Sequence, residues 1–315
     1  MKKLALFATL LLLVFAGTAL AADFPAKNIR LLVPFAAGGG TDAVARALAV
    51  AAEKHLGQSV VVMNRTGGSG AVGMTEGATA KADGYTVTMI TREIAWLPQM
   101  GLAQITPDNF DMIALVNEDP AIMLVQPDSK FTSVKDVIET AKAAPGTVKF
   151  GSTAKPNFYL LALELNQNVK FNQIPYNGAA EAIPALLGGH VEFSMVNPGE
   201  AISQIMAGQL KPLGVCSDVR MAGLPDVPTM TELGYPIVTG TWRGIAVPKG
   251  TPEDVKAILG AALEKAVAEK EFVDFMNGRT LGIRFLNAAD FKTFVENDVK
   301  ALDAVVEEVK KQQQQ

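Results

Sequence analysis

The sequence has very little cysteine and histidine, which narrows the chemistry available to it. Cys216 is the only cysteine among 315 residues, so an internal disulfide is excluded and the core must stabilise the fold. His55 and His190 lie far apart, without a cysteine or carboxylate cluster at the spacing of metal ligands. No Gly-x-Ser-x-Gly motif is present either. The sequence therefore predicts no metal site, no catalytic residue and a buried, unreactive Cys216.

Long apolar runs are also scarce. The one strong run lies at the N-terminus, where Lys2 and Lys3 precede an apolar stretch from Leu4 to Phe15 and small residues follow, ending at Ala21. This order is typical of a cleaved signal peptide over residues 1–21. Nothing later offers the roughly twenty apolar residues of a membrane helix. We therefore expect a protein secreted to the periplasm, without membrane insertion.

Neither sign of charge dominates the chain. There are 28 basic and 32 acidic residues, and the formal net charge is −4. A mildly acidic surface argues against nucleic acid or an anionic membrane as a partner. A small anionic ligand stays possible, because a local patch of backbone dipoles can oppose the net charge.

Short β-branched runs alternate with longer alanine-rich stretches along the chain. This alternation is typical of α/β folds with parallel sheets. The first unit has a strand at 29–35 and a helix at 42–56, which Gly57 ends. Residues 110–129 are then extended, with an interruption near Pro120, before the alternation resumes.

A second extended segment, 241–247, is followed by two or three helices that need a sheet to cover. We interpret the two extended segments as crossings between two α/β lobes, with the C-terminus folded back on the first lobe. The predicted organisation is a signal peptide at 1–21, lobe 1 at 22–120 plus 246–315, and lobe 2 at 121–245.

Three consecutive glycines separate the first strand from the first helix. Gly38, Gly39 and Gly40 can adopt backbone angles closed to other residues, and Thr41 or Asp42 is a suitable N-cap for the helix. Free N–H groups at the positive end of a helix dipole attract carboxylate or phosphate. A tight turn that binds nothing would need the same glycines, so this segment alone leaves both interpretations open.

Ligands of parallel sheets bind beyond the carboxyl ends of the strands. Several loops of this chain occupy that position, and together they would line one cleft if the lobes face each other. The candidate ligand-binding residues are Phe35, Ala36, Ala37, Gly38, Gly39, Gly40, Thr41, Asp42, Thr91, Arg92, Glu93, Ser152, Thr153, Ala154, Tyr176, Asn177, Gly178, Asn197 and Arg243.

Charged residues near this cleft allow two interpretations. Arg243 or Arg92 could grip a carboxylate in a bidentate fork, and a solute that also carries an ammonium would suit the mixed charge around Glu93. Alternatively, Arg92 and Glu118 pair with neighbours and hold the lobes together. Lys155 could likewise bind a second carboxylate or remain solvated. Trp96 and Trp242 could contact a ligand, although aromatic residues at such junctions are more often core.

Seven stretches, in this order, cover nearly the whole chain after the signal peptide and match one family. They are FPAKNIRLLVPFAAGGGTDAVAR, VVVMNRTGGSGAVG, KADGYTV, VIETAKAAPGTVKFGS, PYNGAAEAIPALLGGHVE, GVCSDVRMAGLPDVPTMTELG and WRGIAVPKGTPEDV. Through them the chain resembles the periplasmic solute receptors of tripartite tricarboxylate transporters, also called TctC or Bug proteins. The resemblance implies a type II periplasmic-binding-protein fold and two lobes that close over a small organic carboxylate, such as a di- or tricarboxylate or an acidic amino acid. It also implies delivery to a membrane permease, no catalysis and no cofactor, and we expect a monomer.

The loop that opens the second lobe departs from the family pattern. Many relatives have a glycine-rich loop followed by histidine, where this chain reads GSTAKPNFYL and has Leu160 at the position of the histidine. The resemblance places backbone N–H groups for a ligand carboxylate in this loop and in the loop at 36–42. Because the second loop differs, the identity of the solute does not transfer from relatives.

Two other functions fit parts of the sequence. Gly68, Gly70 and Gly73 follow a strand and open a helix, and Glu93 lies twenty residues on, the spacing of a dinucleotide-binding fingerprint. Export, the family resemblance of the same stretch and the lack of a proton-transfer residue weigh against such an enzyme. A periplasmic sensor that docks on a signalling protein when closed is a further alternative.

Overall fold

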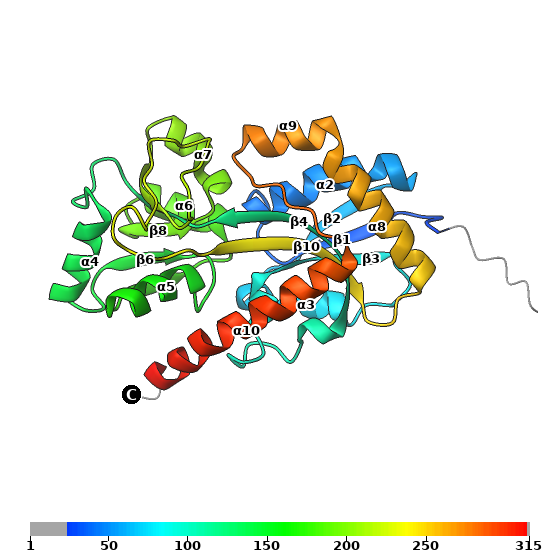
Figure 1. The fold of residues 1–315 in the computed structure, drawn as a ribbon, viewed down its shortest axis with the longest axis horizontal. Coiled ribbons are helices and arrows are strands. Elements are labelled where there is room, and N and C mark those ends of the chain that lie inside the picture. Colours follow the sequence, from blue (N-terminus) through cyan, green and yellow to red (C-terminus); the bar gives the residue numbers. More distant parts are fainter. Residues whose placement is uncertain (1–23, 314–315) are drawn as a thin grey trace, which may run out of the picture.

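Two α/β lobes lie side by side in a computed structural model that describes residues 24–313 (Figure 1). The predicted signal peptide at 1–21 lies outside these residues. Between residues 24 and 313, no helix has both the length and the apolar character needed to cross a membrane.

The first lobe is built on a five-stranded sheet in the order β2-β1-β3-β10-β4. Strands β1 and β3 are parallel to β2, and β10 runs antiparallel to both of its neighbours. These strands are β1 (Ile29–Val33), β2 (Val60–Asn64), β3 (Thr86–Thr91), β4 (Phe110–Pro120) and β10 (Gly240–Pro248).

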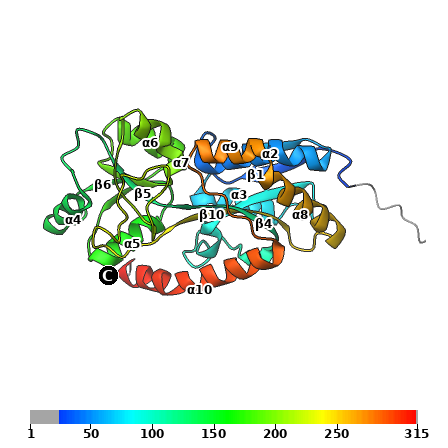
Figure 2. The same ribbon diagram turned by 45° about the horizontal axis from the view of Figure 1, so that its top comes forward.

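Helices cover both faces of this sheet. The apolar stripe of α2 packs against α8 and α9, and α10 packs along β4, so the C-terminal segment returns to the first lobe as the sequence indicated (Figure 2). Gly57 ends α2 in a left-handed conformation, also as predicted. The helices are α2 (Gly40–Leu56), α3 (Ala71–Ala78), α8 (Glu253–Ala268), α9 (Lys270–Gly278) and α10 (Ala288–Gln313), with short 3-10 turns η2 (Gly68–Gly70), η3 (Arg92–Ala95) and η4 (Pro107–Asn109).

The second lobe repeats this plan with the strand order β7-β6-β8-β5-β9. Here β7, β6 and β8 are parallel, and β5 is antiparallel to both of its neighbours. The strands are β5 (Ile122–Val125), β6 (Lys149–Ser152), β7 (Asn172–Pro175), β8 (Phe193–Val196) and β9 (Lys211–Val215), and the helices are α4 (Val134–Ala143), α5 (Phe158–Gln167), α6 (Ala179–Leu187) and α7 (Pro198–Met206).

Two crossings connect the lobes, and each sheet contains one reversed strand beside them. The chain leaves the first sheet at Pro120, enters the second at Ile122 and returns to the first at Gly240. The boundary predicted at 245–246 therefore falls inside β10. The expected parallel arrangement holds for the other strands, and β10 and β5 depart from it. A strand that enters a lobe from the cleft runs against the strands that end there.

The tryptophans and the cysteine lie in the core. Trp96 and Trp242 are each only 2% exposed, and Trp96 stacks on Phe158 of the second lobe with ring centroids 4.8 Å apart. Trp242 packs edge-on against Phe291 of α10. Burial raises the pKa of the Cys216 thiol to about 12, so this side chain is the inert, buried group that the sequence predicted.

Candidate functional site

A small polar cavity lies where the two lobes meet. Its free volume is about 30 Å³, room for roughly one or two water molecules. Both lobes line it, with the residues Phe35, Ala36, Gly39, Gly40, Thr41, Thr91, Glu93, Thr153, Tyr159, Gly178, Ala179, Asn197, Glu200, Thr241 and Arg243. Within the described part of the chain, no group of three or more His, Cys, Asp or Glu side chains is placed to hold a metal ion.

Helix α2 starts two residues earlier than the sequence indicated. Helix α2 begins at Gly40 with Gly39 as its N-cap, so neither Thr41 nor Asp42 is the cap. The Asp42 carboxylate instead braces the loop, accepting hydrogen bonds from the Gly38 amide and from Arg46, each at 2.9 Å. Burial opposes the ionised form, yet these bonds and one from Asn64 hold the pKa of Asp42 below its usual value.

Acceptors of the second lobe already lie against this loop. The Ala36 amide donates to the Asn177 carbonyl oxygen at 3.2 Å. The carboxyl group of Glu200 lies beside Gly40, at the N-terminus of α2, where Glu200 Oε1 is 2.6 Å from the position that a Cβ atom of Gly40 would occupy. This carboxylate sits where the helix dipole favours negative charge. A carboxyl group of the protein itself therefore lies at the predicted anion-binding loop.

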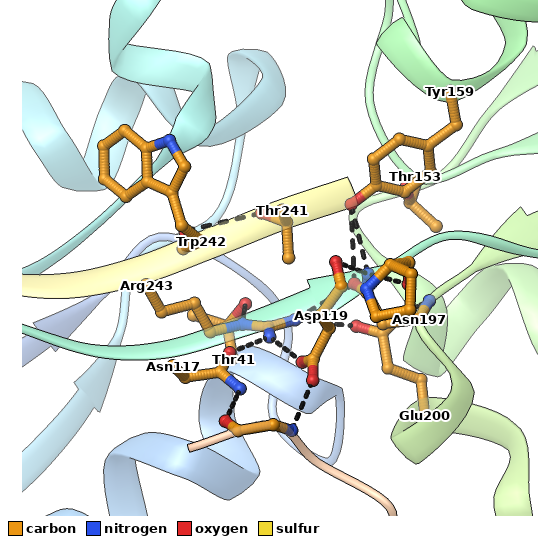
Figure 3. A network of polar contacts seen from close by, with 12 residues as sticks. Thr41, Asn117, Asp119, Thr153, Tyr159, Asn197, Glu200, Thr241, Trp242 and Arg243 are labelled. Atoms are coloured by element: carbon orange, nitrogen blue, oxygen red, sulfur yellow. Dashed lines mark hydrogen bonds and ion pairs between the residues drawn. The ribbon is translucent and has the colours of Figure 1, made fainter. Parts of the chain in front are cut away.

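Arg243 lies at the centre of the site and links the two lobes (Figure 3). It is 1% exposed, and it lies on the opposite side of β10 from Trp242, which enters the core. Its five N–H groups match five acceptors, namely Thr41 Oγ1 at 3.0 Å, Asn117 Oδ1, Asp119 Oδ2 at 2.6 Å, Asn197 Oδ1 at 3.2 Å and Glu200 Oε1 at 3.4 Å. The fork predicted to grip a ligand is thus fully used by the protein.

A second layer of hydrogen bonds fixes these partners at the crossings. Asp119 Oδ1 accepts from the Gly282 amide at 2.6 Å, and Asn117 Nδ2 donates to the Gly282 carbonyl oxygen at 2.5 Å. Asn197 Nδ2 donates to the Pro120 carbonyl oxygen at 3.0 Å. The polar centre is therefore anchored to β4, to the start of α7 and to the segment before α10.

Two acidic groups and a tyrosine face each other across the cavity. Burial raises the pKa of Glu93 and the pKa of Glu200, with nearby Arg243 opposing the shift in both cases. Burial, assisted by the charges of these two carboxyls, also raises the pKa of Tyr159. The Glu93 Oε2 and Thr91 Oγ1 atoms are buried without a hydrogen-bond partner.

Arg92 does not line the cavity, although Thr91 and Glu93 on either side of it do. Its guanidinium reaches Asp298 of α10 at 2.9 Å, Thr239 Oγ1 at 3.1 Å and the Gly240 carbonyl oxygen at 2.9 Å. Glu118 pairs with Arg284. Both side chains therefore make structural contacts at the crossings. This agrees with the alternative interpretation, in which Arg92 and Glu118 pair with neighbours.

Other predicted ligand residues lie outside the cavity lining and make contacts within the protein. Ser152 Oγ donates to the Ala154 carbonyl oxygen, and Ala154 packs in the apolar cluster that contains Trp96. Tyr176 packs against the core of the second lobe, and the Asn177 side chain bonds Glu181. The predicted residues outside the cavity lining are Ala37, Gly38, Asp42, Arg92, Ser152, Ala154, Tyr176 and Asn177.

Four lining residues were not predicted from the sequence: Tyr159, Ala179, Glu200 and Thr241. Tyr159 and Glu200 lie in the first turns of α5 and α7. A sequence signal for Glu200 exists, because Asn197 and Glu200 form a capping box whose spacing is visible before an apolar run. The glutamate of this capping box, at the third position of α7, points back toward the end of β8.

The glycines of the dinucleotide-like motif serve close packing. A Cβ atom at Gly73 would lie 2.6 Å from the Arg65 carbonyl oxygen and 2.8 Å from Pro34 Cα, so α3 approaches the loop after β1 only because the side chain is absent. Ser69 of the same stretch accepts a hydrogen bond from the Lys155 amide at 2.8 Å and thereby connects the lobes.

Comparison with known proteins gives one consistent family. A model of the tripartite tricarboxylate transporter family receptor matches residues 44–310. Protein BugT of Bordetella pertussis is 31% identical over 293 residues, which cover 90% of each chain. The structure of the periplasmic binding protein BugD is 30% identical, with a TM-score of 0.85 over 91% of this chain and 98% of that one.

Two similar structures contain carboxylates. MatC of Rhodopseudomonas palustris with bound malate is 25% identical, with a TM-score of 0.83 over 90% of this chain and all of that one. A second R. palustris protein, with adipate, is 26% identical, with a TM-score of 0.85 over 90% of this chain and 98% of that one.

These matches confirm the resemblance and the two-lobed periplasmic-binding-protein fold. They also decide against the dinucleotide-dependent enzyme, because the family model and the similar structures describe solute receptors. The chain belongs to the tripartite tricarboxylate transporter receptor family.

Proposed function

We propose that this protein captures a small organic carboxylate between its lobes and delivers it to the permease of a tripartite tricarboxylate transporter. The observation that carries the proposal is the position of the Glu200 carboxyl group beside Gly40, at the N-terminus of α2. A site that binds an internal carboxylate offers the same donors to a carboxylate of the solute. The malate and adipate of the similar structures belong to this ligand class.

Binding requires the lobes to separate first. A cavity of about 30 Å³ cannot hold a dicarboxylate, since sites for small molecules have volumes of roughly 300–1,000 Å³. Hinge motion at the crossings, near Pro120 and just before Gly240, would release the Ala36 amide from Asn177 and move Glu200 away from the Gly40 amide. The solute carboxylate then takes over these amides, and the lobes close around it.

The place of action follows from the sequence pattern at the N-terminus. The proposed signal peptide at 1–21 would direct the chain to the periplasm, where a receptor meets solutes before the permease does. No described helix is long and apolar enough to cross a membrane. We assign the transport step itself to a separate permease.

Gly39→Val tests the position of the carboxylate site. Gly39 has extended backbone angles (φ −80°, ψ 174°), so valine fits the loop. A Cβ atom there would point at Ala180 of the second lobe, 3.9 Å from its Cβ, and the valine methyl groups would enter the cleft. We expect parent-like unfolding and loss of the thermal stabilisation by the best ligand of a di- and tricarboxylate panel, which for the parent is about 2.7 kcal/mol at a hundredfold excess over Kd.

The control for this experiment is Gly278→Val, at the end of α9, where no atom lies within 4 Å of an added Cβ. This variant should keep full ligand stabilisation. Parent-like binding by Gly39→Val would place the carboxylate elsewhere.

The transport role has its own test. A strain without the gene should lose uptake of the carboxylate that stabilises the purified protein, because a receptor-dependent permease receives its solute only from the closed receptor. Radiolabelled uptake measures this directly. The parent gene should restore uptake and the Gly39→Val gene should not. Uptake that is unchanged in the deletion strain would contradict delivery to a permease and favour a sensory role.

A further inference from the structure

Side chains of the second lobe are buried in the apolar core of the first. Ala154, Phe158 and Leu161, from the loop after β6 and from α5, belong to the cluster that β4, β10, η3 and α10 build. Phe158 is 7% exposed, and its ring stacks on Trp96 of the first lobe with centroids 4.8 Å apart. Leu160, on the same helix, packs instead in the core of the second lobe. Phe158 therefore packs on the other lobe and not in the core of its own.

Polar contacts join the lobes beside this aromatic pair. Ser69 Oγ accepts a hydrogen bond from the Lys155 amide at 2.8 Å and donates one to the Lys155 carbonyl oxygen at 3.1 Å. The pair also adjoins the ligand cavity, because the Trp96 amide donates to the carbonyl oxygen of Glu93, a lining residue, at 3.0 Å. Movement of one lobe relative to the other must therefore break contacts at this point.

The two aromatic rings contact each other but do not line the cavity. Separation of the lobes would expose both rings to water, and Trp96 is only 2% exposed in this arrangement. Burial of apolar surface and the stacking of the rings thus favour the closed arrangement. Because neither ring lines the solute site, this contact stabilises closed lobes equally with and without a solute.

We propose that Trp96 and Phe158 form an apolar latch that holds the lobes closed and sets the rates at which solute enters and leaves. The latch must open before a solute enters and again before it leaves, so it slows both steps by the same factor. The equilibrium affinity then changes little while most of the unliganded protein is closed. Two side chains outside the solute site would in this way control how fast the receptor exchanges its solute.

Hydrogen exchange tests the latch without any ligand. The Ala36 amide donates to the Asn177 carbonyl oxygen of the other lobe, and neither residue belongs to the latch. Phe158→Ala should accelerate exchange of this amide at least tenfold, because exchange follows the open fraction. NMR on the purified mature chain measures it. The matched control is Phe150→Leu, since Phe150 packs on Phe193 inside the second lobe with ring centroids 5.0 Å apart, and exchange should stay within twofold of the parent.

A second variant, Phe158→Leu, keeps an apolar side chain but removes the stacked ring. We expect it to accelerate exchange of the Ala36 amide at least threefold and less than the alanine variant does. This variant decides the question if the alanine variant does not fold.

Binding kinetics provide a readout that a ligand contact would not give. Stopped-flow experiments use malate or adipate, whichever binds the parent more tightly. Phe158→Ala should raise the association and dissociation rate constants about tenfold each and change Kd less than threefold. Loss of a direct ligand contact would raise the dissociation rate constant alone and weaken Kd. That second pattern would overturn the latch.

The latch and the proposed function can fail separately. Parent-like exchange of the Ala36 amide in a folded Phe158 variant would overturn the latch and leave carboxylate capture intact. Equal acceleration by Phe150→Leu would also overturn the latch, because exchange would then follow overall stability. Accelerated exchange in the Phe158 variants alone, in a protein that binds no carboxylate, would support the latch and contradict the proposed function.

Discussion

Replacing Arg243 with alanine is expected to lower the free energy of unfolding by about 3–5 kcal/mol, the usual cost of removing one partner from a buried ion pair. Asp119 has a fully buried side chain and Glu200 is only 10% exposed, so neither carboxylate can turn to water when the guanidinium is lost. Asn117, Asn197 and Thr41 would also lose a donor. Chemical denaturation of parent and variant measures the effect.

A lysine variant separates the effect of the positive charge of Arg243 from the effect of its five hydrogen-bond donors, and an exposed arginine serves as the control. Arg243→Lys keeps the charge but offers three donors for five acceptors, so we expect a loss between those of the parent and the alanine variant. Arg220→Ala removes an arginine whose partner, Glu232, is about half exposed, and should cost only about 0–1 kcal/mol. A parent-like midpoint for Arg243→Ala would contradict the view of Arg243 as the anchor between the lobes.

The fold was largely predictable from the alternation of strands and helices. Strand direction was not, because residues buried on both faces give the same apolar pattern whichever way the strand runs. The direction of β10 follows from the path of the chain: it leaves the first lobe along β4 and returns beside it, so the two strands must be antiparallel. The exact return point at Gly240 depends on pairing with Pro120, which no local pattern specifies.

The site was predictable where it is built from loops at strand ends. The glycine loop, Thr91, Glu93 and Asn197 all line the cavity. Arg92 lies between two lining residues, but its side chain has partners on the other side that only the tertiary structure brings near, above all Asp298 of α10. Strand β3 ends at Thr91, and Arg92 and Glu93 begin the 3-10 turn η3. Successive side chains of such a turn point about 120° apart, so the three candidates could not all face one cleft.

The contacts of the glycine loop could not be predicted, because they depend on how the lobes close. A Cβ atom at Gly40 would lie 2.6 Å from Glu200 Oε1 and 2.7 Å from Glu200 Cγ, so a side chain there would displace Glu200. The close approach of the second lobe at this point therefore depends on the glycine. In this arrangement of the lobes the Glu200 carboxyl group lies at the N-terminus of α2, where we propose that the solute carboxylate binds. The two groups would compete, and the affinity for the ligand would depend on the difference between their binding free energies.

Glu200→Gln should therefore bind the solute carboxylate about tenfold more tightly at pH 7. A glutamine has one carbonyl oxygen, which can accept from the Asn197 amide and preserve the cap of α7, but cannot also accept from Arg243. The difference between a charged and a neutral acceptor is about 1–1.5 kcal/mol, and 1.4 kcal/mol corresponds to a factor of ten. Titration calorimetry with the best ligand of the panel measures it.

Glu181→Gln is the matched control for this variant. Glu181 occupies the corresponding position in the first turn of the neighbouring helix α6, where it accepts from the Asn177 amide at 3.0 Å and does not line the cavity. Its substitution should leave the affinity within about threefold of the parent, a change of less than ~1 kcal/mol. Equal affinities of the Glu200→Gln variant and the parent at pH 7 would contradict the competition.

The pH dependence provides a second readout of the same competition. Because burial raises the pKa of Glu200 above its usual 4.5, the folded protein binds its proton more readily than the unfolded chain does. The ionised group therefore destabilises the fold above the raised pKa, and this penalty disappears as the pH falls toward 4.5. Glu200→Gln should accordingly be more stable than the parent at pH 7, with the difference vanishing near pH 4.5. Over the same range the ratio of the variant's ligand affinity to the parent's should fall toward one, since a protonated Glu200 carries no charge to compete with the solute. Measuring both proteins at each pH cancels the protonation of the solute itself.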